Sequence, residues 1–567
     1  MKTTTLIYSL FVMIFVSILS NSCKVISDEN NPPATTYYTT LDKTIIPDIV
    51  PVTPVVRIDD PANFTKKGYG TWNFGPGLPS QKRLDLMPSG YDATSTTQTA
   101  KLLRFFTITD IHITDKESPG QAIVFAPKAG PNAISCYSPL MLYTTQVLDA
   151  TIQTINDINK RNSFDLGLAL GDMINSDQFN ELRWFIDVLD GKIINPDSGT
   201  KDDPVKGANN DYQDEFQAVG LDHLIPWYAT IGNHDHFWLG SLPMSDNMKK
   251  IMVGNTIMKL PNILDATDKQ YYSVGTLDGS TQYGTIIGAG RIDTMTNIPT
   301  IAPDSNRHAL SKADLISQFS NSTSSPKGHG FIQSNSANVL GGCYSFEPKP
   351  GLPLKIIVLD DTQDESDPRP AEGIYGHGEL NNGRYEWLMA QLQAGQDSNQ
   401  LMIISAHVPI GVCQGTAMGW LPAPGYSNEN NLIAQLQTFP NLILWVSGHR
   451  HLNNVTAFAS TDTAHPENSF WEVETKSLRE FPEQFRTFDI MRNSDNTLSI
   501  ITVNVDPNIK EGSLAATGRR YAIASNQIYG LPGTNLPTGS VSYNAELVKQ
   551  LSPKMKEIIK NYIAPLK

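Results

Sequence analysis

Between residues 100 and 450 the chain alternates between short apolar runs and longer segments whose apolar residues recur with helical spacing. The runs include "KLLRFFTIT", "FDLGLAL", "LKIIVLD" and "NLILWVSG". They are apolar at nearly every position, which is typical of strands that are buried on both faces. This alternation predicts a layered α/β domain in which helices flank central sheets.

The alternation changes in three places. Near the C-terminus "SFWEVETKS", "FRTFDIMR" and "TLSIITVNV" follow one another without helices, which predicts antiparallel strands and therefore mixed sheets. Residues 240–350 are rich in Gly, Ser, Thr and Asn and too numerous for a simple loop, so we expect an insertion with its own structure over the site. The segment "SYNAELVKQLSPKMKEIIKNY" near the end of the chain reads as a charged helix that packs on the body.

These patterns divide the chain into successive parts. The main domain is expected at 98–507. Before it lie a tether at 23–60, rich in Pro, Thr, Asn and Asp, and a loop-rich lead-in at 61–97. A C-terminal extension follows at 508–567.

The N-terminal residues "MKTTTLIYSLFVMIFVSILSNSC" predict a secretory signal peptide over residues 1–22. Cys23 directly follows small residues, which resembles the lipobox of bacterial lipoproteins. That resemblance implies a lipid anchor on Cys23, the only expected link to a membrane, and a place in a bacterial cell envelope. Leu19 stands four residues before the cysteine instead of three, so a secreted or periplasmic protein is the alternative.

Charge and cysteine content exclude other classes. The net charge of −14 over 567 residues argues against a nucleic-acid-binding protein. It also does not attract phosphate substrates over a distance, so an anion site has to be made locally, for instance by metals. Cys136, Cys343 and Cys413 are scattered, which excludes a disulfide scaffold, allows one bridge and offers no thiolate zinc motif.

Five of the predicted strands are followed by side chains that can bind metals or protons. These are Asp110 and His112, then Asp172, then Asn233, His234 and Asp235, then His407, and finally His449 and His451. In open α/β sheets, sites assemble at the C-terminal ends of strands. Each fragment alone has a bland explanation, such as a capping Asp beside a surface His. However, five of the 11 histidines fall in these fragments. In the "GHRH" segment, an extended backbone would point both imidazoles to one side.

The fragments and their order, D-x-H, G-D, G-N-H-D, H and G-H-R-H, resemble the calcineurin-like metallophosphoesterase superfamily from about residue 103 to 505. The segments "VLDDT" and "GHGELNNGRYEWLMAQL" are further points of similarity. The resemblance implies the layered metallophosphoesterase fold and hydrolysis of phosphoester bonds.

The resemblance also implies which residues act. One metal would be held by Asp110, His112, Asp172 and His451, and a second by Asp172, Asn233, His407 and His449. His234 would stand near the departing oxygen, with Asp235 orienting its imidazole. Two ions about 3.5–4 Å apart would share Asp172 and a hydroxide that attacks phosphorus. Mixed oxygen and nitrogen ligands admit Fe, Mn or Zn. Asn175 stands where purple acid phosphatases have a metal-binding tyrosine, so purple iron–tyrosinate chemistry is not expected.

Other polar and aromatic residues near these motifs are expected to be structural. The Arg450 side chain should point away from the flanking histidines, His236 should lie outside the ligand set, and Asp115 should serve as a turn or cap. Trp238 and Trp420 either stack on an organic group of a substrate or pack in a lid.

The resemblance thus implies an exported hydrolase of a phosphodiester or phosphomonoester, and by analogy with the family we expect a phosphodiesterase that acts on a small-molecule or lipid-linked substrate. The separate substrate-recognition domain of the 5'-nucleotidases in this superfamily is not evident. One alternative is a phosphomonoesterase, a phosphatase that scavenges phosphate. The other is a non-catalytic cell-surface binding protein that retains the fold, which would predict lost ligands, and none is missing here.

Overall fold

The structure is a computed structural model that describes residues 37–51, 53–130, 134–199, 214–333, 341–365, 375–410, 429–530 and 543–562. The expected signal peptide, Cys23, Cys413 and Trp420 lie outside these residues. No helix within the described ranges combines the length and apolarity needed to cross a membrane.

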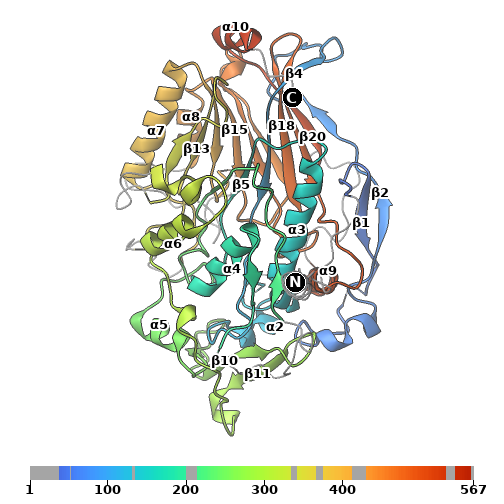
Figure 1. Cartoon of the computed structure of the whole chain (residues 1–567), viewed down its shortest axis with the longest axis vertical. Coiled ribbons are helices and arrows are strands. Elements are labelled where there is room, and N and C mark those ends of the chain that lie inside the picture. The colour runs from blue at the N-terminus through green and yellow to red at the C-terminus, as the bar shows by residue number, and fades with distance from the viewer. Residues whose placement is uncertain are drawn as a thin grey trace, which may run out of the picture.

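Two mixed sheets form the centre of the molecule (Figure 1). In spatial order, the six-stranded sheet contains β12 (Tyr344–Phe346), β13 (Leu354–Val358), β14 (Leu401–Ser405), β15 (Leu442–Ser447), β17 (Phe470–Glu474) and β16 (Asn454–Phe458). The seven-stranded sheet contains β3 (Gln81–Arg83), β20 (Ala545–Lys549), β19 (Leu498–Val505), β18 (Phe485–Asn493), β4 (Gln98–Ile108), β5 (Leu166–Ala169) and β8 (Trp227–Ala229). Parallel pairing joins β13, β14 and β15 in one sheet and β4, β5 and β8 in the other.

Helices cover the outer faces of the sheets, as the alternating sequence pattern predicts. α7 (Asn382–Asp397) and α8 (Glu429–Leu436) pack on the six-stranded sheet, for example through Leu388 against Ile357 and Ile404 in one apolar cluster. α3 (Thr144–Asn159) and α4 (Phe179–Leu189) pack on the seven-stranded sheet within the largest cluster. The layered α/β fold with mixed sheets is therefore confirmed.

The insertion at about 240–350 has its own secondary structure. It contains α5 (Asp246–Val253), β9 (Lys259–Pro261), β10 (Tyr271–Asp278), β11 (Thr285–Arg291) and α6 (Lys312–Gln318). Its three strands form a separate antiparallel sheet at the lower end of Figure 1. Backbone hydrogen bonds join it to the loop that follows His112: the Met258 N–H donates to the Pro119 carbonyl, and the Leu277 N–H donates to the Lys116 carbonyl. The insertion is therefore attached directly to a loop that carries expected metal ligands.

The tether prediction is wrong for the described residues from 37 onward. β1 (Lys43–Pro47) pairs antiparallel with β2 (Trp72–Pro76). Ile45 and Ile58 are 1% and 2% exposed and belong to an apolar cluster. The Pro- and Asn-rich composition predicts a tether, but these aliphatic residues gain free energy by burial and hold the segment on the domain.

Two expectations for the C-terminal part are also wrong. The segment "SYNAELVKQL" supplies strand β20, which pairs with β19 and β3 inside the main sheet, and only α10 (Pro553–Asn561) is the charged helix. Before it, α9 (Leu514–Tyr529) is largely buried. The three tail strands do form antiparallel pairs, β17 with β16 and β18 with β19, but β17 also pairs parallel with β15 and lies in the six-stranded sheet, so the three do not form one antiparallel unit. Residues 508–567 therefore help to complete the central sheet.

Minor elements connect these parts. They are the short helix α2 (Ala126–Ala129) and the two-residue strands β6 (Ile193–Ile194) and β7 (Phe216–Gln217), which pair with each other.

Candidate metal centre

The seven expected metal ligands follow five strands from both sheets, each within four residues of the strand's last residue. Asp110 and His112 follow β4, Asp172 follows β5, and Asn233 follows β8. The remaining three ligands, His407, His449 and His451, follow β14 and β15. Because these strands run parallel within each sheet, their carboxyl ends lie at one edge, where the loops meet.

One group of ligands consists of Asp110, His112 and His451. The distance from His451 Nε2 to Asp110 Oδ1 is 3.1 Å, and from His451 Nε2 to His112 Nε2 it is 3.2 Å. Two ligands at right angles around one ion, with bonds of about 2.1 Å, are about 3 Å apart. The spacing of these side-chain atoms therefore suits a single cation.

A second group consists of Asp172, His407 and His449. His407 Nε2 lies 3.3 Å from Asp172 Oδ2, and Asn233 Oδ1 lies 3.0 Å from His407 Nε2 and 3.1 Å from His449 Nδ1. The Asn233 amide nitrogen donates to the Gly240 carbonyl at 2.9 Å, which turns the amide oxygen toward the histidines. Asp172 also groups with His112 and His234, so its carboxylate lies between the two sets.

Hydrogen bonds behind the ligands fix their orientation. His407 Nδ1 donates to the Leu170 carbonyl at 2.8 Å, and His451 Nδ1 contacts Glu480 Oε1 at 2.5 Å. Histidines that bind metals commonly donate their other ring nitrogen in this way. Two further buried ring nitrogens, Nδ1 of His112 and Nε2 of His449, have no hydrogen-bond partner in the described part of the chain. The donors comprise two carboxylates, one amide oxygen and four imidazoles, a set that fits two ions such as Mn, Fe or Zn.

The electrostatics of the cluster are strongly coupled. Burial opposes a proton on His407, but the Asp172 carboxylate outweighs it and raises the pKa to about 10. Burial likewise opposes a proton on His451, and Glu480 and Asp110 raise its pKa to about 10. Burial and the charge of His407 lower the pKa of His449 to about 3. Because a cation competes with protons for these nitrogens, metal binding here releases protons and weakens at low pH.

Five of the expected ligands adopt the left-handed backbone conformation, which is uncommon outside glycine. The φ values are 51° for Asp110, 48° for His112, 49° for Asp172, 66° for His449 and 54° for His451. The expected extended backbone in the "GHRH" segment is therefore wrong, because β15 ends at Ser447. Arg450 nevertheless points away from the histidines, as expected, and donates to Glu474 from Nε at 2.8 Å.

His234 joins the cluster, but its orientation does not come from Asp235. Its Nδ1 lies 2.8 Å from the carbonyl oxygen of Asn175, and its backbone N–H donates to Asp172. The Asp235 carboxylate instead accepts backbone N–H groups from Met173, Ile174 and Gly232. The expected orienting role of Asp235 is therefore wrong, because its carboxylate is occupied in tying the loops after β5 and β8 together.

Sequence reasoning missed the segment after β17. Glu480 contacts His451, and the buried Arg479 donates to the Asn175 side-chain oxygen at 2.6 Å. The Ser477 hydroxyl donates to the Asp110 carbonyl at 2.7 Å. The signal was present, because "KSLRE" follows the apolar strand "FWEVE" just as the expected ligands follow their strands.

Three neighbouring residues lie outside the ligand set. His236 Nε2 contacts the Thr362 hydroxyl at 2.9 Å. Asp115 caps a local turn and also forms a buried ion pair with Arg307 of the insertion at 3.1 Å. Trp238 is 4% exposed and its indole N–H donates to the Gly120 carbonyl at 2.8 Å, so it packs in the interior and does not stack on a substrate.

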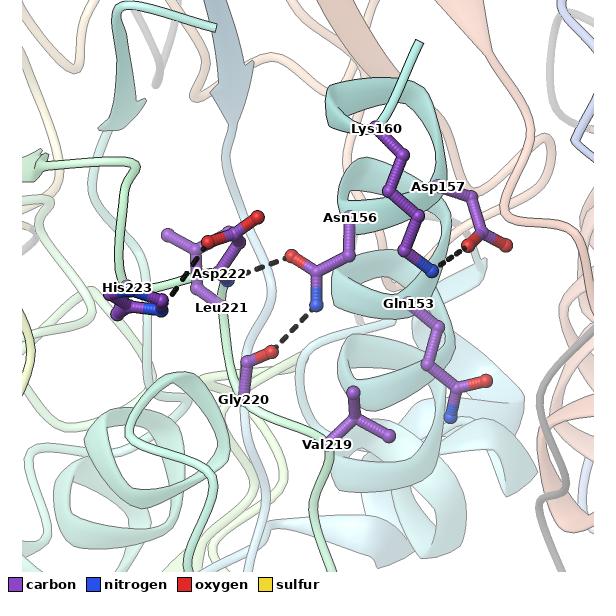
Figure 2. A pocket seen from close by; sticks show the side chains of 9 residues that line it. All are labelled: Gln153, Asn156, Asp157, Lys160, Val219, Gly220, Leu221, Asp222 and His223. Atoms are coloured by element: carbon purple, nitrogen blue, oxygen red, sulfur yellow. Dashed lines mark hydrogen bonds and ion pairs between the residues drawn. The ribbon is translucent and has the colours of Figure 1, made fainter. Parts of the chain in front are cut away.

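A separate cavity of about 430 Å³ lies between α3 and residues 219–223 (Figure 2). The Asn156 side chain bridges its two walls, donating to the Gly220 carbonyl and accepting from the Asp222 N–H. α3 leads into β5 and residues 219–223 lead toward β8, so this cavity lies at the amino ends of strands whose carboxyl ends carry the ligands. It is therefore not part of the metal centre.

Comparison with known proteins identifies a family whose sequence model spans this site. The family model described as calcineurin-like phosphoesterase matches residues 103–453, which include all seven expected ligands. No curated protein sequence matches the chain. A dimetal phosphatase from Danio rerio is 11% identical, with a TM-score of 0.36 over 72% of this chain and 97% of its own. A putative 5'-nucleotidase from Staphylococcus aureus is 12% identical, with a TM-score of 0.29 over 72% of this chain and 54% of its own. The structure of PhoD is 9% identical, with a TM-score of 0.28 over 81% and 80%.

The family match covers more than half of the chain and contains both groups of metal-capable side chains. The chain therefore belongs to the calcineurin-like phosphoesterase family and is a phosphoester hydrolase.

Proposed function

We propose that this hydrolase is exported and cleaves a phosphodiester in a small or lipid-linked molecule with the help of two metal ions. The observation that carries the proposal is the position of Asp172, whose carboxylate belongs to a group with His112 and His234 and to another with His407 and His449. A shared carboxylate between two sets of ligands is what a pair of closely spaced ions requires.

Each ion has its own set of residues in this proposal. The first would be held by Asp110, His112, His451 and Asp172, and the second by Asn233, His407, His449 and Asp172. When bound, such ions withdraw charge from phosphoryl oxygens and lower the pKa of water. The protein contributes by holding the donor atoms about 3 Å from one another before any ion arrives.

His234 would donate a proton to the leaving oxygen. The Asn175 carbonyl can only accept a hydrogen bond, so Nδ1 of His234 carries a hydrogen in every protonation state. Nε2 is therefore the nitrogen that gains and loses the catalytic proton. Burial lowers the pKa of His234 and the nearby Asp172 carboxylate partly offsets this, which keeps the imidazole ready to give up its proton. As the bond from phosphorus to the leaving oxygen breaks, that oxygen receives the proton from Nε2.

The test is hydrolysis of bis-p-nitrophenyl phosphate and p-nitrophenyl phosphate by the full chain with Mn, Fe or Zn supplied. We expect faster cleavage of the diester. His234→Ala should lower kcat by about 10²–10⁴-fold while metal content stays near that of the wild type. Asp172→Asn should lose activity together with metal.

Other outcomes would favour the alternatives. Preference for the monoester would support a phosphatase that scavenges phosphate. Absence of activity with every metal would contradict the proposed hydrolysis and support a binding protein that retains the fold.

Export and anchoring rest on the sequence of residues 1–23 alone. We expect the protein in the membrane fraction of a bacterial host, with incorporation of labelled fatty acid that Cys23→Ser abolishes. Recovery of both variants in the soluble exported fraction would instead indicate a secreted or periplasmic protein.

A further inference from the structure

A buried carboxylate, that of Glu181, lies behind the catalytic cluster and has no role in the metal sets. Glu181 is 0% exposed and stands in the first turn of α4. Its Oε1 accepts the backbone N–H of Asp115 at 2.8 Å, and its Oε2 accepts those of Asn175 at 3.1 Å and Ser176 at 2.9 Å. Within the described residues, no basic side chain forms an ion pair with it.

These three N–H groups belong to two different ligand loops. Asp115 lies in the loop that carries Asp110 and His112, whereas Asn175 and Ser176 lie in the loop that carries Asp172. One side chain thus links the loops that follow β4 and β5, in addition to direct backbone hydrogen bonds such as that from the His112 N–H to the Asp172 carbonyl at 3.0 Å. Loss of these oxygens would leave the buried N–H groups of Asp115 and Ser176 without their acceptor, which costs about 1–3 kcal/mol for each group, whereas the Asn175 N–H would keep the Ile113 carbonyl.

The same side chain acts on His234 through one residue. The Asn175 N–H donates to the Glu181 carboxylate, and the Asn175 carbonyl lies 2.8 Å from His234 Nδ1. Arg479 holds the side-chain oxygen of Asn175 at 2.6 Å. Glu181 and Arg479, both buried, therefore help to fix Asn175, together with the Ile113 carbonyl, which accepts the same Asn175 N–H at 3.0 Å.

The three backbone N–H groups all donate to one carboxyl group, that of Glu181. Burial raises the pKa of Glu181 to about 8, the nearby Asp115 carboxylate adds to this increase, and the N–H groups of the two loops oppose it. The positive end of the α4 dipole also favours a negative charge in the first helical turn.

The long insertion holds the outer end of this network. Arg307 is fully buried and donates to Asp115 Oδ2 at 3.1 Å and to the Ser198 hydroxyl. Asn180, beside Glu181, donates to the same Asp115 oxygen at 2.8 Å. A continuous series of buried contacts thus runs from the insertion through Asp115 and Glu181 to Asn175 and His234.

We propose that Glu181 is a positioning residue for catalysis, which holds the two ligand loops together and keeps the Asn175 carbonyl on Nδ1 of His234. The inference rests on the proposed role of His234 as the proton donor. It assigns to Glu181 and Asn175 together the orienting task that the sequence motif suggested for Asp235.

Glu181→Gln is the sharpest test, because it keeps the shape of the side chain but turns one acceptor oxygen into an N–H₂ group that faces a backbone N–H. We expect kcat for bis-p-nitrophenyl phosphate to fall by about 10–100-fold, while KM and metal content stay near the wild-type values. Asp190→Asn is the matched control. Asp190 is the C-cap of the same helix, about 14 Å away along its axis, where its carboxylate accepts hydrogen bonds from Ser322, Thr323 and Ser324. The Asp190→Asn variant should be less stable than the wild type but keep the wild-type kcat.

A second measurement does not depend on activity. In protein labelled with ¹⁵N-histidine, the His234 signals are identified by their loss in His234→Ala. The wild type should show a proton on Nδ1, whereas Glu181→Gln should show a mixture of tautomers. If the Gln variant does not fold, Glu181→Asp keeps the charge but withdraws it by one methylene, and should lower kcat as well.

The outcomes separate the two proposals. An inactive wild type would overturn the proposed function. An active wild type, together with a folded Glu181→Gln or Glu181→Asp variant that has unchanged kcat and an unchanged His234 tautomer, would overturn the positioning role.

Discussion

Gly240 touches both His234 and Asn233, which makes Gly240→Ala a direct test of the geometry of the site. A Cβ atom at this position would lie 2.3 Å from His234 Nε2, 2.2 Å from His234 Cδ2 and 2.5 Å from Asn233 Nδ2. Ordinary contact between heavy atoms begins near 3.5 Å. The imidazole and the amide would therefore each have to move by about 1 Å, or the loop would have to move away from them.

The Gly240→Ala substitution should have a small effect on stability and a larger effect on the reaction rate. Gly240 has a φ of +67°, so any side chain there adds about 1–2 kcal/mol of backbone strain, a small fraction of the stability of a domain of this size. Misplacement of a catalytic group by about 1 Å lowers the rate by about 100-fold. The displaced Asn233 amide should also weaken the second metal set. We therefore expect a modest loss of thermal stability, a fall in kcat of about 100-fold and reduced metal content.

The matched control is Gly351→Ala. Gly351 has a φ of +75° and no heavy atom within 4 Å of a Cβ, so it carries the same backbone strain away from the site. The assay is hydrolysis of bis-p-nitrophenyl phosphate, with metal content by mass spectrometry and thermal unfolding measured on the same samples. If both variants lose the same stability and both keep wild-type kcat and metal, the placement of His234 and Asn233 at the reacting centre is refuted.

Three further predictions concern the surroundings of the site. Glu480→Gln removes the charged partner of His451 Nδ1 and should weaken the first metal by about 10–100-fold in competition with a chelator; unchanged affinity would show that Glu480 does not support this ligand. Burial opposes ionisation of Asp190, but Lys192 and the Ser322–Ser324 segment lower its pKa to about 2. Because folding lowers this pKa, the ionised Asp190 stabilises the folded state at pH values above the unfolded pKa of about 3.9. This contribution is lost as the pH falls toward 2. Asp190→Asn should thus lower the free energy of unfolding by about 1–2 kcal/mol at pH 7, since solvent screens part of the charge, and the difference in urea titrations should disappear near pH 2. Chelation of metal from the wild type should abolish activity and lower Tm, and Mn or Zn should restore both; a chelated protein with full activity would contradict the metal-dependent reaction.

The convergence of the expected ligands could be predicted because their chemistry coincides with a strong pattern. Asp110, Asp172 and His407 each follow an apolar run that can only be a buried strand, and parallel strands end at one edge of a sheet. The supporting contacts could not be predicted in the same way. The partner of His234 is a backbone carbonyl, that of Asn175, which leaves no trace in the residue type. Glu480 reaches His451 across 29 positions, and only the pairing of β15 with β17 brings them together.

The wrong predictions of secondary structure have a common cause. The segment "NAELVKQ" contains good helix formers, yet residues 545–549 form β20 because β19 and β3 offer backbone partners on both sides. Intrinsic propensity amounts to a few tenths of a kcal/mol per residue, which tertiary pairing readily outweighs. The segment that forms β1 is likewise Pro-rich in composition, but burial of Ile45 holds it in a strand.

The glycines of the sequence motifs are required because neighbouring atoms leave no room for a side chain. A Cβ on Gly232 would lie 2.2 Å from the backbone nitrogen and from the carboxylate of Asp172, and a Cβ on Gly448 would lie 2.1 Å from the Thr109 hydroxyl and 2.4 Å from Asp110 Oδ2. Each of these glycines thus lets the loop of one strand press against a ligand that follows another strand. The ligand next to Gly448 is His449, whose N–H donates to the Asp110 carboxylate and whose backbone is left-handed. The residues G-N-H-D and G-H-R-H therefore specify more than donor atoms. They specify the close approach of loops that holds the expected ligands in a strained backbone conformation, which is the kind of preorganisation that a dinuclear site requires.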